Sequence, residues 1–366
     1  MELAQASVTR LRHGLLRNLV PGMLLLLVGL LVVAPLLKIT FVTLTPEGLE
    51  AWQAVLASKL SENLWWRPLI NTLALGLGVA SGCLLLGGFL AWLVVMTDVP
   101  GRRLLGVMST LPFMIPSFAA ALAWGTLFRN SRMGGSVGYF EANGLIIPDW
   151  LAWGLVPTLI VLVAHYYSLA YTIIAAALSS VGADLVESAQ MAGARRGRIF
   201  FGIVLPVVTP ALVSAASLTF AGAVSNFAAP ALLGLPVRMQ TISTRLFGMI
   251  EIGSVERGFV LALLLIAVSA TFLYFSDRLV SGRKAFVTVT GKGGRTRRFG
   301  LGVWRWPLFG LALGLGVLTT VVPVVVLVAS SLAPQAGALF SNWSLHFWIG
   351  ESGGAIAQGQ AGIFRN

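Results

Sequence analysis

The charged stretch at residues 187–206, ESAQMAGARRGRIFFGIVLP, stands out in a chain that is 57% hydrophobic and only 10% charged. Asp184 and Glu187 lie three residues apart, which is the capping-box pattern of a helix start. Gly193 suits the left-handed turn that often ends a helix. The stretch therefore suits a short capped interfacial helix whose arginines meet lipid headgroups.

Few other side chains could carry chemistry. Cys83 is the only cysteine, so no disulfide can form within the chain. GKGG at 291–294 lacks the Gly-x4-Gly-Lys-Ser/Thr spacing of a phosphate-binding loop, and it predicts no nucleotide site. His165 has no Cys, Asp or Glu nearby, so it cannot bind iron firmly by itself. We therefore expect no catalytic residue, no resident metal and no cofactor.

Long apolar blocks, with a mean hydropathy of +0.87, indicate a membrane protein. A helix needs about 20 apolar residues to cross the hydrocarbon core, where lipid offers no partner to an unpaired backbone group. The predicted fold class is all-α, a polytopic bundle of about seven transmembrane helices in the cell inner (plasma) membrane. The predicted spans are 19–41, 69–96, 104–128, 151–181, 204–232, 258–276 and 304–330.

The net charge of +12 has an uneven distribution that indicates orientation. With a cytoplasmic N-terminus, the inner segments hold about three basic residues for each acidic one, whereas the outer segments are balanced. The basic excess therefore favours contact with anionic lipid headgroups and no nucleic acid.

The end of the chain repeats features of its beginning. Pro307 opens an apolar block containing VVPVVVLVASSL, as Pro21 opens one containing VVAPLLKITFVTL. The repeat predicts one whole unit and the first span of a second, cut short at Asn366, with Gly310, Gly314 and Gly316 forming a small-residue face for helices outside the chain. The predicted parts are a cytoplasmic segment 1–18, a six-span unit 19–276 with a loop at 182–203, a basic cytoplasmic linker 277–303, and the second-unit start 304–366.

The charged stretch resembles the EAA loop of binding-protein-dependent ABC importer permeases. The match extends over Glu187, Ser188, Ala189, Gly193, Ile203, Leu205 and Pro206, with Ser188 in place of the usual alanine. In that family the loop forms a coupling helix that docks in a groove of a separate ATP-hydrolysing subunit. The resemblance implies that Glu187 faces a basic group on the ATPase, Ala189 allows close approach and Gly193 makes the turn.

Residues 97–124, 226–247 and 287–298 resemble the fused, double-unit permeases of ferric iron importers. That resemblance implies an ATP-driven permease for ferric iron, with thiamine, phosphonate, sulfate and polyamine as alternative cargoes. The chain itself is expected not to be an enzyme. The implied partners are two cytoplasmic ABC ATPases, an external (periplasmic) solute-binding protein, membrane lipid and a second permease unit.

A secondary transporter and a structural anchor are the rival classes. The predicted spans two to six contain no Asp, Glu, Lys or Arg, which disfavours coupling to protons or sodium ions. Pro112 and Pro116 are expected to bend span three, because each removes a helix hydrogen bond.

A few polar side chains could line a translocation path. His165 could instead be a packing residue or bind metal. Ser225 and Asn226 stand midway along predicted span five, where they would face other helices or a cavity. The candidate path residues are His165, Tyr171, Ser225 and Asn226.

Overall fold

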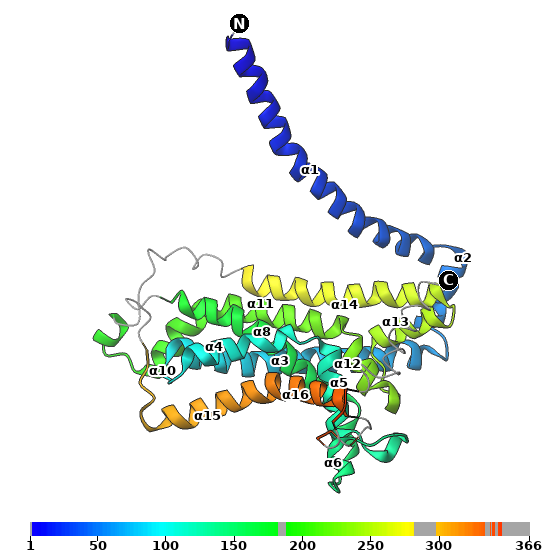
Figure 1. Ribbon diagram of the computed structural model, residues 1–366. Coiled ribbons are helices and arrows are strands. Elements are labelled where there is room, and N and C mark those ends of the chain that lie inside the picture. Colours follow the sequence, from blue (N-terminus) through cyan, green and yellow to red (C-terminus); the bar gives the residue numbers. More distant parts are fainter. Residues whose placement is uncertain are drawn as a thin grey trace. The chain divides into compact units, whose positions relative to one another are not determined.

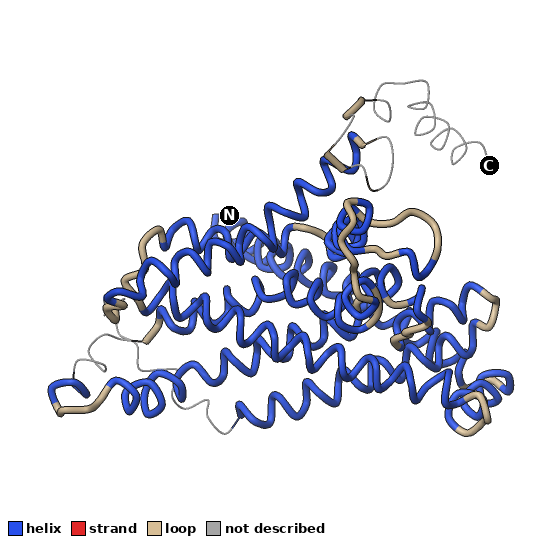
Figure 2. The backbone as a smooth tube through the Cα atoms, turned by 90° about the horizontal axis from the view of Figure 1, so that it is seen from below, coloured by secondary structure: helices blue, strands red, loops and turns tan. Residues whose placement is uncertain are grey.

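The computed structural model describes residues 2–181, 188–281 and 298–333, together with 337, 339–340 and 343–345. Within these residues the regular elements are all helices, and the β-type pairing is an isolated bridge between Thr97 and Phe299 (Figure 2). Six helices are long and apolar enough to cross a membrane, or seven if one bent pair counts as a span. The predicted all-α bundle of about seven spans is confirmed.

The chain forms two compact units, one of Met1–Trp65 with Leu246–Leu264 and the other of Trp66–Arg245 with Leu265–Asn366. The first unit contains α1 (Glu2–Thr43), α2 (Pro46–Leu56) and parts of α13 (Ile242–Glu251) and α14 (Val255–Ser281). Helix α2 begins after Thr45, because Pro46 occupies the first turn and the Thr45 side chain accepts a hydrogen bond from the Gly48 N–H.

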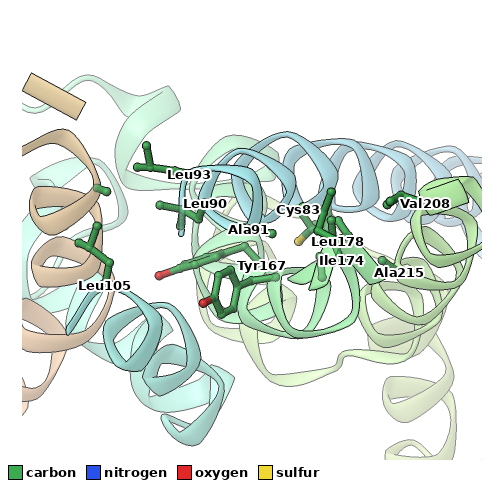
Figure 3. Packing of buried hydrophobic residues seen from close by; sticks show 14 of the residues in the cluster. Cys83, Leu90, Ala91, Leu93, Leu105, Tyr167, Ile174, Leu178, Val208 and Ala215 are labelled. Atoms are coloured by element: carbon green, nitrogen blue, oxygen red, sulfur yellow. The ribbon is translucent and has the colours of Figure 1, made fainter. Parts of the chain in front are cut away.

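Three long helices form the centre of the second unit: α3 (Arg67–Met96), α8 (Leu155–Ser179) and α11 (Leu205–Ser225). They pack against one another (Figure 1). Small residues permit this, since a Cβ at Gly87 of α3 would lie 2.7 Å from the Tyr167 carbonyl oxygen of α8. Figure 3 shows the buried side chains between the helices, including Cys83, Tyr167 and Ala215.

The third span is broken into α4 (Arg102–Thr110), a 3₁₀ turn η2 (Leu111–Met114) and α5 (Ser117–Phe128). The two halves meet at 94°. Pro112 opens the 3₁₀ turn and Pro116 directly precedes α5. The predicted bend at these prolines is therefore confirmed, as a complete break.

The fifth span differs from the prediction of 204–232. It begins with α10 (Arg196–Ile199) and a π-helical turn η4 (Phe200–Val204), and it ends with α11 at Ser225. A separate helix, α12 (Ala228–Leu233), follows. The reason is Pro230, which lacks the N–H that a continuous helix would direct at the Asn226 carbonyl. Ser225 and Asn226 therefore lie at a helix end, and their predicted place midway along a span is wrong.

The last span consists of η7 (Gly302–Trp304), α15 (Arg305–Gly316), the π-helical η8 (Val317–Val321) and α16 (Val322–Leu332). Within the second unit α15 packs against α4 and α16 against α5. Its start is held by the loop after α3, where the Asp98 carboxylate accepts a 2.8 Å hydrogen bond from the Leu301 N–H. The remaining short elements are η1 (Glu62–Trp66), η3 (Ser131–Met133), α6 (Tyr139–Ala142), α7 (Asp149–Ala152) and η5 (Leu235–Val237).

Candidate coupling loop and intramembrane site

The described part of the charged loop begins at Ser188, and residues 188–191 are helical. Gly193 ends this turn with a φ of +76°. The Gly193 N–H bonds the Gln190 carbonyl at 2.9 Å and the Ala194 N–H bonds the Ala189 carbonyl at 2.9 Å. This is a Schellman motif, so the predicted left-handed stop at Gly193 is confirmed. Glu187 and Asp184 lie outside the described residues.

The short helical turn has two different faces. Ala189, together with Ala194, packs against the hydrophobic core of the second unit. Ser188, Met191 and Ala192 are exposed, and their spacing places them on one helical face. Met191 is 84% exposed. Sequence reasoning missed Met191, although its place three residues after Ser188 on the helix was a usable signal.

The second half of the loop leads into the fifth span through the π-helical turn. The Leu205 N–H bonds the Phe200 carbonyl, one residue farther back than in an α-helix. Pro206, in the first turn of α11, lacks an N–H of its own. Ile203 packs against the core, Leu205 is half-buried and Pro206 is exposed. The three residues thus make the transition from loop to span.

His165 lines a cavity of about 540 Å³ in the second unit. The cavity wall is mostly aliphatic and aromatic and includes Pro112 and Ile115 from the break in span three. The imidazole stacks on Phe113 with ring centroids 5.2 Å apart. This wall is too apolar to bind a hydrophilic solute well, and His165 fits a packing role beside the break.

The other candidate path residues do not line this cavity. Tyr171 is buried, with 6% of its surface exposed. The Ser225 hydroxyl is exposed and donates to the Ala221 carbonyl of its own helix at 2.8 Å. Asn226 is half-buried among polar groups. The four residues therefore do not converge on one described pocket, but His165 and Asn226 share Tyr166 as a neighbour.

A small group of polar side chains surrounds Asn226, and we call Asn226, Ser117, Tyr166 and Ser243 the Asn226 cluster. The Asn226 amide donates to the Ser117 hydroxyl at 2.9 Å and to the Tyr166 hydroxyl at 3.4 Å. Its side-chain oxygen accepts from the Ala229 N–H at 3.1 Å, and its carbonyl accepts from the Ser243 hydroxyl at 2.8 Å. The cluster joins α5, α8 and the α11–α12 break. Sequence patterns indicated Asn226 but not its partners.

Among the residues that the structure describes, no three His, Cys, Asp or Glu side chains gather in a group that could hold a metal ion. The described residues provide an exposed turn in the loop and, at a second place, two helix breaks joined by hydrogen bonds. Both features are suited to transmitting motion.

Comparison with known proteins gives the class. The family described as binding-protein-dependent transport system inner membrane component matches residues 83–286, which include the loop and the Asn226 cluster. The chain belongs to this family. It is the permease subunit of an ABC importer, a multi-pass inner-membrane protein and not the ATP-hydrolysing component.

Sequence identity to individual relatives is low. The chain is 27% identical over 208 residues to a protein of Marchantia polymorpha named "Probable sulfate transport system permease protein cysT", a match that covers 55% of this chain and 68% of the relative. It is 30% identical over 159 residues to the trehalose permease protein SugB of Mycobacterium tuberculosis, covering 43% and 51%. A crystal structure of a bacterial alginate importer shares the fold, with a TM-score of 0.58, 18% identity and coverage of 76% of this chain and all of that one.

Proposed function

We propose that the loop at 188–206 receives a cytoplasmic ATPase subunit and passes its motion to the fifth span. The family match extends over this loop, and the Schellman turn at Gly193 gives it a fixed shape. The face that carries Met191 and Ala192 is exposed. An exposed methionine at its centre suits a groove on a soluble partner, because methionine adapts its shape to an irregular apolar surface.

The proposed assembly has two ATPases, two permease units and an external solute-binding protein. One path between two units needs two coupling loops, and the described residues provide one. A neighbouring solved structure is of an alginate importer in complex with a periplasmic protein that carries an alginate pentasaccharide. By analogy, a binding protein delivers the cargo of this chain on the outer side.

The proposed cargo is a small oxyanion of the sulfate or phosphonate class. This replaces ferric iron, which receives no support from the similar proteins. One of these is named for sulfate, and another, PhnU of Salmonella typhi, for 2-aminoethylphosphonate, with 26% identity over 172 residues. The test is uptake of radiolabelled sulfate, phosphonate and ferric citrate by the assembled importer, each with its binding protein. Uptake of iron alone would overturn the oxyanion proposal and leave the permease role intact.

Replacing Gly193 tests the coupling role. A valine there must adopt the left-handed backbone that β-branched residues avoid, so the turn should reopen. We expect the Gly193→Val permease to insert normally and the importer that contains it to hydrolyse ATP without transport, a loss of more than about tenfold in cargo moved per ATP. Met191→Asp and Glu187→Lys should weaken ATPase binding. Gly197→Ala is the matched control, because that glycine lacks a positive φ and a Cβ there would meet no atom within 4 Å.

The measurements are ATP hydrolysis and uptake in the same proteoliposomes, with the amount of inserted protein determined by immunoblot. Full transport by Gly193→Val and Met191→Asp at normal membrane levels would show that this loop does not couple the ATPase to the path.

A further inference from the structure

We propose that Asn226 fastens two helix breaks to each other and so holds the transport path closed, and that its bonds to Ser117 and Tyr166 part when the path opens. This inference rests on the proposed importer function. It assigns positioning roles to residues of α5, α8 and α11 that lie well away from the coupling loop in the sequence.

The first observation is that both breaks arise from prolines. Pro116 precedes α5 at the 94° bend of span three. Pro230 stands four residues after Asn226, where a continuous helix would need its missing N–H. Irregular backbone at membrane depth is tolerated only where it is buried in protein or lines a cavity. Two breaks side by side therefore need polar partners, and the Asn226 cluster supplies them.

The second observation is that the side-chain amide and the backbone carbonyl of Asn226 both have hydrogen-bond partners. Its amide nitrogen has two acceptors, its side-chain oxygen accepts from the Ala229 N–H, and its carbonyl accepts from the Ser243 hydroxyl. Tyr166 stands near the middle of α8, and its hydroxyl also donates to the Gly222 carbonyl at 3.0 Å. The Asn226 side chain thus connects the end of α11 to the start of α5 and to the central helix α8.

The third observation is the exposed apolar surface beside the break in span three. Met114 is 77% exposed, and Phe113 and Phe118 are 48% and 51% exposed. These side chains lie on both sides of the break that the Asn226 cluster holds. Bulky apolar side chains there would exclude water while the breaks stay fastened.

The bonds that cross between the breaks are suited to a reversible contact. Hinge motions use a few residues at helix ends, and here a rotation at Pro116 separates Ser117 from Asn226 without unwinding a helix. The bonds of Asn226 to Ala229 and Ser243 can persist, because they stay on its own side of the contact. Ser225, the adjacent residue, bonds only to its own helix, so it provides a matched control.

The experiment uses the importer assembled with its ATPases, second permease unit and binding protein in nanodiscs, and it measures ATP hydrolysis with and without binding protein. Asn226→Ala should raise hydrolysis without binding protein by about three- to tenfold, the shift expected from losing the two membrane hydrogen bonds that cross the contact. Ser117→Ala and Tyr166→Phe should each give part of this rise, and Ser225→Ala none. Hydrolysis that falls in Asn226→Ala by the same factor with and without binding protein would show a merely structural role and overturn the proposal.

A cross-link keeps the test valid if Asn226→Ala does not fold. Ser117→Cys and Ser225→Cys, in a Cys83→Ser background, keep Asn226 itself and can be joined by a reducible bifunctional thiol reagent. Joining them should stop uptake, and a reductant should restore it. Uptake by the joined protein at the unjoined rate would contradict the proposal. If unmodified importer shows no stimulation by binding protein at all, the proposed function fails instead.

Discussion

The first and last membrane spans of this chain are similar in sequence character and opposite in packing. Both are long apolar helices with a proline inside or at a turn, Pro35 in α1 and Pro323 in α16. The most apolar 18-residue window of Pro21–Thr43 contains no buried residue, whereas the corresponding window of Gly302–Leu332 is partly buried against its own unit. Hydrophobicity therefore does not decide which membrane helix packs against other helices.

The difference follows from the solvent. Lipid is as apolar as leucine, so helices in it associate through close contact of small residues and through hydrogen bonds. The last span has both, because a Cβ at Gly316 would lie 2.9 Å from the Met108 Cβ and the Thr319 hydroxyl lies 3.0 Å from the Tyr167 hydroxyl. In α1, neither Gly22 nor Gly29 has an atom within 4 Å of where a Cβ would lie.

The strongest test of this difference in packing is at Gly101, which lies against Phe309 of the last span. Gly101 has a φ of +61°, and a Cβ added there would lie 2.7 Å from the Phe309 ring. Gly101→Leu should lower the free energy of unfolding by about 2–4 kcal/mol, the sum of backbone strain and overpacking against α15. Gly253→Leu is the control, since Gly253 has a φ of +80° in a Schellman turn but open space around its Cβ position, and it should lose only the strain part. Unfolding in mixed micelles of mild detergent and SDS measures both. Equal losses would mean that α15 does not press on this loop.

A second test separates two glycines on the same helix. Gly316→Leu should cost about 1–3 kcal/mol because it forces α15 away from Met108. Gly314→Leu should be nearly neutral, since nothing lies within 4 Å of its Cβ position. The expectation that Gly310, Gly314 and Gly316 together face helices outside the chain is thus wrong for Gly316, which contacts α4. If Gly314→Leu cost as much as Gly316→Leu, the packing of α15 would have to be redrawn.

Sequence patterns predicted the number of spans and the turn at Gly193 because both depend on local features: the length of apolar runs and the conformational freedom of one glycine. They misplaced the end of span five, since the block 204–232 is apolar throughout and only Pro230 indicates the break at Asn226. The partners Ser117, Tyr166 and Ser243 are distant in the chain, so no local period reveals them. The exposure of Met191 depends on which side of a short turn packs inward, and that is settled by tertiary contacts.

The hydrogen bond between Tyr167 of α8 and Thr319 of the last span contributes less to stability than the glycine contacts. Tyr167→Phe and Thr319→Val should each have a small effect, and a double-mutant cycle should give a coupling of about 0.6 kcal/mol, the mean found for hydrogen bonds between membrane helices. The Thr319 hydroxyl keeps its own bond to the Leu315 carbonyl in Tyr167→Phe, which limits the loss. A coupling near zero would indicate that glycine contacts alone hold the last span in place.

The smallest expected effect is in α1. Gly29→Leu should change the free energy of unfolding of this chain by less than about 0.5 kcal/mol, as for a substitution that touches nothing. Unfolding in the same mixed micelles measures this change, with Gly316→Leu as the contrasting variant. A loss of stability in the chain alone would show that α1 packs within this chain, and the contrast with the last span would disappear.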